Sequence, residues 1–407
     1  MDEITKPTLK RRLNLPLLVL YGLGVTIGAG IYVLVGATAA KAGFYAPISF
    51  LLAALVVTFT GFSYAEFSTR FPVSAGEAAY VREGLGLSSL ATLVGFMVIA
   101  SGVVSSAAVS LGAAAYLHTF IPIPETVLLA CVIALVGLIA LWGIMESVSL
   151  AAVVTVIEIG GLGLVIYFGF IVKPDLLMDF DLLIPPLEIP AWSGIFGAGL
   201  IAFFAFVGFE DIANVAEEVR EPRKTMPSGI FLTLIIATFV YFAVVSVVVL
   251  VVPMEELTGS NAPLSLIFNA APPWVRTFFS IVGFLATING ALIQVIMASR
   301  VIYGLSVQKS LPNFLGTINK VTRTPHYATL LVTVIVCVLA YFFPISDLAE
   351  MTSTIVLIVF SIVNLSLIRF KWKDSQPLDK STFIAPIWMP FLGLLSSVSL
   401  LTVGFLT

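Results

Sequence analysis

Charged residues are scarce in this chain. Only 11% of its 407 residues are Asp, Glu, Lys or Arg, whereas 59% are hydrophobic and the mean hydropathy is +1.10. A single soluble core of this size would not use so much apolar surface, so the sequence indicates an integral membrane protein. The net charge of -3 is small, and nucleic acid is not a plausible partner.

Cysteine and histidine are nearly absent as well. Cys131 and Cys337 lie singly in apolar segments, so they suggest neither a disulfide nor a metal site, and we expect both to be small buried residues. His118 and His326 lie near the ends of apolar segments, with no nucleophile or metal-ligand spacing beside them. The phosphate-binding loop of an ATP-driven pump is also missing, so an enzyme is the least favoured class and we expect no bound metal.

Apolar segments long enough to cross a bilayer, about 20 residues each, recur eleven times. The charged segment Met1 to Arg12 runs directly into the first of them, so no cleavable signal is expected. The expected spans are Leu15 to Ala40, Ala46 to Phe67, Ser88 to Phe120, Thr126 to Met145, Val148 to Val172, Trp192 to Val215, Met226 to Val252, Pro273 to Ser299, Tyr327 to Phe343, Glu350 to Arg369, and Ile384 to Thr407.

The basic residues alternate with these spans. All but three of the 20 Lys and Arg residues fall on the side of the N-terminus, the exceptions being Lys41, Lys173 and Arg276. Because cytoplasmic loops retain Lys and Arg, this bias supports the number of spans. It predicts a multi-pass protein of the cell membrane with a cytoplasmic N-terminus.

Glycine clusters inside the first span, at Gly22, Gly24, Gly28 and Gly30. Glycine weakens a helix interior, and a broken helix is tolerated in a bilayer only where it lines protein or a cavity. The cluster therefore predicts a binding site at the midplane. Close helix packing is the alternative explanation for these glycines, and a dinucleotide fingerprint is excluded because no strand precedes them.

A second weak point lies in the sixth span, where Gly208 precedes Glu210 and Asp211. The two acids either mark the end of the helix or lie within its inner half, and apolar residues resume at Ile212 and Val215. The first and sixth spans cross in opposite senses. Interrupted helices at matching positions of two opposed halves are typical of secondary transporters built from inverted repeats.

Several motifs resemble those of the amino acid/polyamine/organocation (APC) superfamily of permeases, and the resemblance extends over nearly the whole chain. It implies an all-α membrane fold of two five-helix inverted repeats with discontinuous helices 1 and 6, about residues 15–172 and 192–369, plus an extra helix at about 384–407. The usual family has twelve helices, so eleven is a departure. The motifs are Thr26 to Tyr32, Tyr64 to Glu66 with Phe71 and Pro72, Gly76 to Tyr80 with Gly84, Phe206 to Glu210 with Glu217, Glu218, Glu221, Pro222 and Pro227, and Arg300, Tyr303, Leu311, Pro312 and Thr324 to His326.

Backbone groups freed at the two breaks suit an α-amino acid. We expect the N–H groups of Gly28, Ala29 and Gly30 to hold a carboxylate at the positive end of a half-helix. We expect the free carbonyls around Thr26 and from Phe204 to Val207 to accept hydrogen bonds from an ammonium. Ala29 carries a methyl group where many family members have a hydroxyl. The expected substrate-binding residues are Thr26, Ile27, Gly28, Ala29, Gly30, Phe204, Ala205 and Val207.

The resemblance also places an aromatic gate at Phe204, although this phenylalanine is equally explained as a core or lipid-facing residue. Glu158 is the acid most clearly inside a span, and proton-coupled relatives carry a lysine at about this position. Intramembrane ionisable residues are functional candidates by default. Glu158 either loads a proton, or coordinates a cation or pairs with a base, or is a structural hydrogen-bonding residue. Glu210 and Asn289 are further coupling candidates.

These observations predict a secondary active transporter of amino acids, coupled to protons by symport. The alternatives are an amino acid exchanger or a polyamine carrier on the same scaffold and, from another class, a channel. We expect no cofactor beyond a coupling ion, a proton or sodium, and no partners beyond the substrate and membrane lipids. The sequence does not fix the oligomeric state.

Overall fold

The computed structural model describes residues 11, 13–28, 30–72, 76–142, 148–307, 311–319, 321–322, 324–373 and 382–406. Nearly all of these residues are helical, and the only β-type pairing among them is a single parallel bridge between Leu13 and Val219. The α-helices are α1 Leu15–Ile27, α2 Gly30–Ala42, α3 Ala46–Arg70, α4 Gly76–Leu85, α5 Ser88–His118, α6 Glu125–Trp142, α7 Val148–Val172, α8 Ile189–Phe204, α9 Pro222–Val251, α10 Met254–Thr258, α11 Pro273–Val307, α12 His326–Phe342, α13 Ile345–Lys373 and α14 Trp388–Leu406.

Short 3₁₀ segments connect several helices. They are η1 Gly43–Tyr45, η2 Leu176–Leu183, η3 Phe209–Glu218, η4 Pro263–Ala270 and η5 Asn313–Gly316. The all-α fold expected from the sequence is confirmed.

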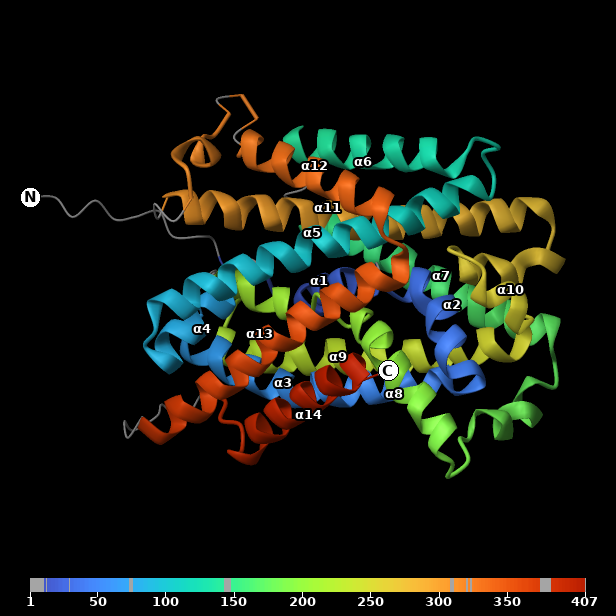
Figure 1. Ribbon diagram of the computed structural model, residues 1–407, viewed down its shortest axis with the longest axis horizontal. Helices are drawn as coiled ribbons and strands as arrows, with labels where there is room; N and C mark the ends of the chain where they lie inside the picture. The colour runs from blue at the N-terminus through green and yellow to red at the C-terminus, as the bar shows by residue number, and fades with distance from the viewer. Residues whose placement is uncertain are drawn as a thin grey trace, which may run out of the picture.

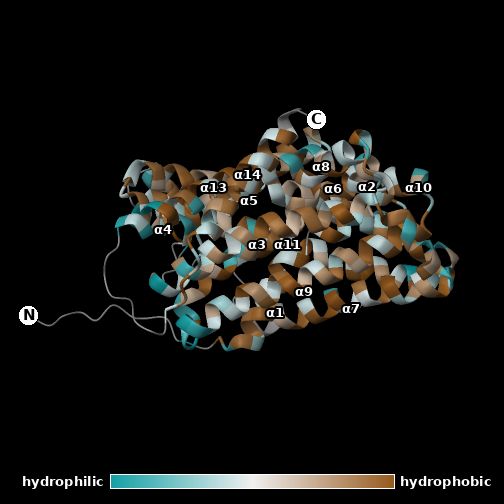
Figure 2. Ribbon diagram, turned by 90° about the horizontal axis from the view of Figure 1, so that it is seen from below, coloured by the Kyte–Doolittle hydropathy of each residue, from teal (hydrophilic) through white to brown (hydrophobic). Residues whose placement is uncertain are grey.

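The long helices run roughly along one axis of the molecule, as Figure 1 shows. Apolar residues cover their middles, and hydrophilic residues gather toward the two ends (Figure 2). Eight helical stretches of the described chain are long and apolar enough to cross a membrane, and α1, α12 and α14 are shorter apolar helices. One of the eight stretches, Gly30–Arg70, contains both α2 and α3. With α1 and α2 taken as one crossing, α3 as the next, and α8 with η3 as another, the described helices make eleven crossings.

The observed crossings differ from the expected spans mainly at their ends. The eighth extends to Val307 and the tenth begins at Ile345. The expectation that both cysteines are buried is wrong for Cys131, which is exposed on α6, while Cys337 is partly buried. The outer face of a membrane helix contacts lipid, so an apolar residue there needs no protein partner.

The helix pairs that pack together in one half of the chain correspond to those that pack together in the other half. In the first half α1 packs against α7 and α9, and in the second half α8 packs correspondingly against α13 and α3. The contact of α7 with α11 likewise has its counterpart in the contact of α13 with α5. Exchanging the first five crossings with the next five reproduces each of these contacts, as an inverted repeat would.

Candidate functional site

The first crossing is interrupted between α1 and α2. The N–H of Gly28 still donates to the carbonyl of Gly24, at 3.3 Å, so Gly28 completes the last turn of α1. The helix resumes at Gly30, and Ala29 lies outside the described residues. Gly28 was expected to offer its N–H to a ligand, but this group is already used. The N–H groups that begin a helix are those of the first turn of α2, at Gly30, Ile31 and Tyr32.

The sixth crossing is interrupted after Phe204, where α8 ends. Turns lead to Gly208, whose φ of 114° is a left-handed value that favours glycine. The chain then continues as η3, so the second half of this crossing is a 3₁₀ segment and not an α-helix. The carboxylate of Glu210 accepts a hydrogen bond from the N–H of Gly208 at 2.9 Å. Glu210 therefore stabilises the break itself.

The two interruptions lie against each other. A Cβ added to Gly30 would be 2.8 Å from the Cβ of Ala205 and 2.9 Å from its N, and closer still to its Cα. A Cβ added to Gly208 would lie 2.7 Å from Val25 Cγ1 and 2.9 Å from the Val25 carbonyl. The glycines thus allow a backbone-to-backbone approach that any side chain would prevent. The N-terminus of α2 and the C-termini of α1 and α8 meet at one point.

Tyr241 of α9 links the two breaks, and the sequence analysis missed it. Its hydroxyl lies 2.8 Å from the carbonyl of Thr26 and 2.8 Å from that of Ala205. One hydroxyl has a single hydrogen, so the two carbonyls share it. These are two of the carbonyls that were expected to accept from a substrate ammonium. A tyrosine in the middle of an apolar span needs a partner for its hydroxyl, and that requirement was the available signal.

One side of the paired breaks is polar. Glu158 of α7 accepts a hydrogen bond from Asn289 Nδ2 of α11 at 3.2 Å, and the Tyr32 hydroxyl donates to the Glu158 carbonyl at 2.6 Å. A Cβ on Gly28 would lie 3.6 Å from Glu158 Oε1, so the carboxylate adjoins the end of α1. The other oxygens of this pair, Glu158 Oε2 and Asn289 Oδ1, are buried without a hydrogen-bond partner in the described structure. A buried oxygen without a partner, as each of these two is, can take a proton or a small cation.

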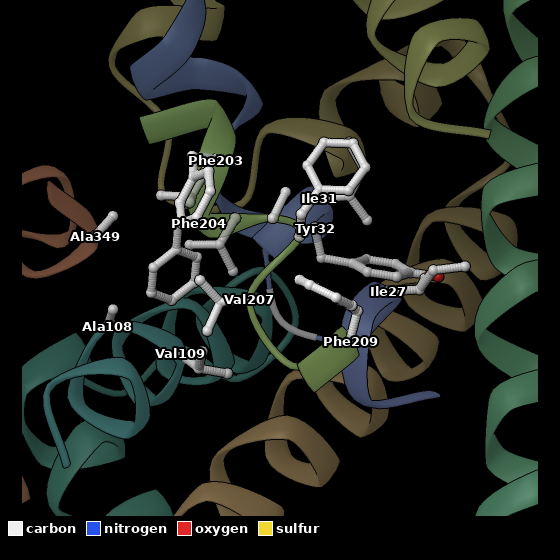
Figure 3. Packing of buried hydrophobic residues seen from close by; sticks show 14 of the residues in the cluster. Ile27, Ile31, Tyr32, Ala108, Val109, Phe203, Phe204, Val207, Phe209 and Ala349 are labelled. Carbon is white, nitrogen blue, oxygen red and sulfur yellow. The ribbon is translucent and has the colours of Figure 1, made fainter. Parts of the chain in front are cut away.

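The opposite side is apolar. Phe204 and Val207 lie beside Ala108 and Val109 of α5, with Ala349 of α13 beyond them (Figure 3). All five residues are buried. Neither α5 nor α8 contains an Asp, Glu, Lys or Arg residue. A group that enters this side therefore meets hydrocarbon.

The site is closed in this conformation. Of the expected substrate-binding residues, Thr26, Ile27, Gly28, Gly30, Phe204, Ala205 and Val207 are all buried. Two cavities of about 450 Å³ each lie elsewhere, one lined by Arg11, Arg70, Pro222 and Lys224 among others, and one lined by Trp142, His326 and Tyr327 among others. A substrate that reaches the breaks must therefore open a path between helices.

A buried acid also lies outside the spans. Glu77 of α4 accepts a hydrogen bond from the Tyr64 hydroxyl at 3.3 Å. Burial, with a smaller contribution from the nearby carboxylate of Asp211, raises the pKa of the Glu77 carboxyl from 4.5 to about 7. Glu77 thus changes its charge near neutral pH at the contact between α4 and η3.

Comparison with known proteins finds similar chains. The family model described as amino acid permease matches residues 13–407. The branched-chain amino acid permease BcaP of Bacillus subtilis (strain 168) is 29% identical over 391 residues, which cover 90% of this chain and 82% of the relative. The cationic amino acid transporter 2, vacuolar, of Arabidopsis thaliana is 31% identical over 405 residues, 92% of this chain and 62% of the relative. The methylthioribose transporter of Bacillus subtilis (strain 168) is 28% identical over 412 residues, which cover 96% of this chain and 87% of the relative.

Proposed function

Because this chain belongs to the amino acid permease family of the APC superfamily, we propose that it is a secondary active transporter that works by alternating access. Its substrate is an amino acid with an apolar side chain, and its coupling ion is a proton. Amino acid transport is the activity that the relatives' names support. The remaining steps rest on the geometry of the breaks.

The observation that carries the proposal is the contact of the two breaks at Gly30 and Ala205. The N-terminus of α2 presents N–H groups and the positive end of a helix dipole, which favour a carboxylate. The carbonyls of Thr26 and Ala205 face the Tyr241 hydroxyl, a donor that an ammonium group can replace. An α-amino acid carries both charges at the spacing of two adjoining helix ends. Phe204 is the gate of this site in our proposal.

The apolar side of the site favours a neutral substrate side chain. A cationic side chain beside Phe204, Val207 and Val109 would lose its hydration without gaining a carboxylate partner, which costs several kcal/mol. Glu350, which follows Ala349 on α13, already pairs with Lys41 at 2.6 Å. Relatives include both a branched-chain permease and cationic amino acid transporters, and the apolar wall supports the first kind of substrate.

Coupling is assigned to Glu158 together with Asn289. The Glu158 carboxylate adjoins the end of α1 through Oε1, and its Oε2 is buried without a hydrogen-bond partner in the described structure. Adding or removing a proton on this carboxylate therefore acts beside a helix that the substrate also contacts. Sodium binding at the same oxygens is the alternative. Glu210 already accepts from the Gly208 N–H, and this bond supports a structural role instead.

We also propose that the two repeats comprise residues 15–172 and 192–369, with 384–407 as an added helix, in a cell-membrane protein whose N-terminus is cytoplasmic. The exchange of packing partners between halves supports the division. The bias of Lys and Arg toward the N-terminal side supports the orientation.

The test is uptake of labelled amino acids into proteoliposomes containing the purified full chain. Leucine, valine, phenylalanine, lysine, glutamate and putrescine are compared with and without pH and sodium gradients. The proposal expects saturable uptake of the apolar amino acids, accumulated only with a pH gradient. Uptake that requires an amino acid inside the vesicle would mean an exchanger, a sodium requirement would replace the proton, and single-channel current would mean a channel.

A further inference from the structure

A buried ionic cluster, formed by Glu66, Arg70 and Lys371, joins the ends of α3 and α13. Glu66 Oε1 accepts from Arg70 at 2.9 Å and 2.7 Å, and Oε2 accepts from Lys371 Nζ at 2.7 Å. The exposed fractions of the three side chains are 0%, 8% and 11%. The Arg70 guanidinium also lies 4.9 Å from the ring centroid of Phe370. All three charges are therefore held in fixed positions away from water.

The chain leading into α14 completes the cluster. The N–H of Ala385 donates to Glu66 Oε2 at 2.9 Å, and Lys371 Nζ donates to the carbonyl of Ala385 at 2.7 Å. From there α14 packs against α3, α8 and α13. The ends of α3 and α13 and the start of α14 lie at the same end of the molecule as α4 (Figure 1). One backbone unit thus ties the last helix to two others.

The polar contact between α3 and α13 continues toward the middle of the spans. Ser63 donates to Asn364 Oδ1 at 2.6 Å, and Asn364 Nδ2 donates to Thr60 Oγ1 at 2.9 Å. Thr60, Ser63, Glu66 and Arg70 recur at helical spacing on one face of α3, a stripe about 15 Å long. We call this stripe, with Asn364 and Lys371 opposite, the α3–α13 seam.

Stability alone does not account for such a seam. The cluster carries two positive charges and one negative charge, and burying ions costs several kcal/mol that their attraction repays only in part. Apolar faces slide past one another with small changes in energy. Ion pairs and the hydrogen bonds of a side-chain amide, in contrast, are either made or broken. If α3 and α13 separate, the seam would pass from the closed state observed here to a separate, hydrated state with no stable intermediate between them.

We propose that the α3–α13 seam is the lock that keeps the path to the breaks closed at this end of the molecule, with Lys371 as a positioning residue that acts through Glu66 and Ala385. The inference rests on the proposed function, because only alternating access requires α3 and α13 to separate. Closing the seam also places α14 against α8, the helix that ends at the second break.

Crosslinking the seam tests this directly. In a chain carrying Cys131→Ala and Cys337→Ala, we would introduce Ser63→Cys and Asn364→Cys, whose parent side chains touch, and bridge the thiols with mercuric ion. Leucine uptake into proteoliposomes should fall at least roughly tenfold and return when dithiothreitol removes the metal. Ser63→Cys alone, treated identically, is the control. Unchanged uptake by the bridged double variant would overturn the lock, whereas no uptake by the unsubstituted chain, measured in parallel, would count against the proposed function.

A second measurement addresses Lys371. Lys371→Met removes the ammonium but keeps the stem, Lys371→Arg keeps the charge, and Lys373→Met removes an exposed charge on the same helix. The readout is modification of Ala213→Cys, a buried position in η3, by a membrane-impermeant maleimide applied from this face. We expect modification roughly tenfold faster in Lys371→Met than in Lys373→Met, with Lys371→Arg restoring the slow rate. Equal rates in folded Lys371→Met and Lys373→Met would refute the assignment, and if Lys371→Met does not fold the crosslink decides.

Discussion

Gly30→Ala puts one methyl group where the two breaks touch. The new Cβ would lie 2.8 Å from Ala205 Cβ and 2.9 Å from Ala205 N, against an ordinary contact of 3.4 Å or more. The obstructing atoms belong largely to backbone, so the two half-helices must separate by at least about 0.5 Å. Overpacking of this kind costs about 1–3 kcal/mol. If that cost falls on the closed state that binds substrate, uptake decreases by roughly 10- to 100-fold.

The matched control is Gly160→Ala. A Cβ on Gly160 of α7 meets nothing within 4 Å, and alanine favours a helix by about 1 kcal/mol over glycine. This variant should transport normally and unfold at the same or a higher temperature. Leucine uptake at several concentrations, with thermal unfolding of both variants in parallel, gives the comparison. If Gly30→Ala transports as well as Gly160→Ala, the contact between the breaks is not part of the binding site.

Three further predictions follow from individual side chains. Tyr241→Phe leaves the Thr26 and Ala205 carbonyls without their shared donor, which should lower the stability of the substrate-free protein by about 1–3 kcal/mol. It should also lower the KM for leucine, because the substrate ammonium no longer has to displace the hydroxyl; an unchanged KM would separate this hydroxyl from the site. Glu158→Gln should abolish leucine accumulation driven by a pH gradient but leave leucine counterflow intact. Glu83→Gln, on the exposed face of α4, is the control, and intact accumulation by Glu158→Gln would exclude a proton role. Burial raises the pKa of Glu77 from 4.5 to about 7, so between these pH values the folded state holds a proton that the unfolded state has lost. The free energy of unfolding should therefore fall by about 3 kcal/mol at most as the pH rises through that interval. Glu77→Gln should flatten this loss between pH 5 and pH 8, and a melting temperature that depends on pH as in the unsubstituted protein would contradict it.

Much of the fold could be predicted from composition. Apolar runs gave the eleven crossings because a bilayer sets the length of a span, and the positions of Gly28, Gly30 and Gly208 marked both interruptions because few other residues tolerate such backbone contacts or a φ of 114°. These signals are local. They need only neighbouring residues along the chain.

The arrangement around the breaks depended on distant residues and was harder to predict. Tyr241 lies 215 residues from Thr26 in sequence, and no pattern in the residues around either one predicts their hydrogen bond. The use of the Gly28 N–H by α1 depends on where the last turn ends, which patterns place only within a few residues. The expected residues Phe204, Glu158 and Asn289 do gather at the breaks, but on opposite sides, a division that periodicity in single helices does not reveal.

The central claim is that two adjoining breaks bind both charges of an amino acid. Its most direct test is competition against labelled leucine uptake in proteoliposomes by unlabelled leucine, by 4-methylpentanoate, which lacks the ammonium, and by 3-methylbutylamine, which lacks the carboxylate. The account predicts strong competition by leucine and at least roughly 100-fold weaker competition by either analogue, because each leaves one set of buried backbone groups unpaired. Competition by either analogue as strong as that by leucine would contradict it.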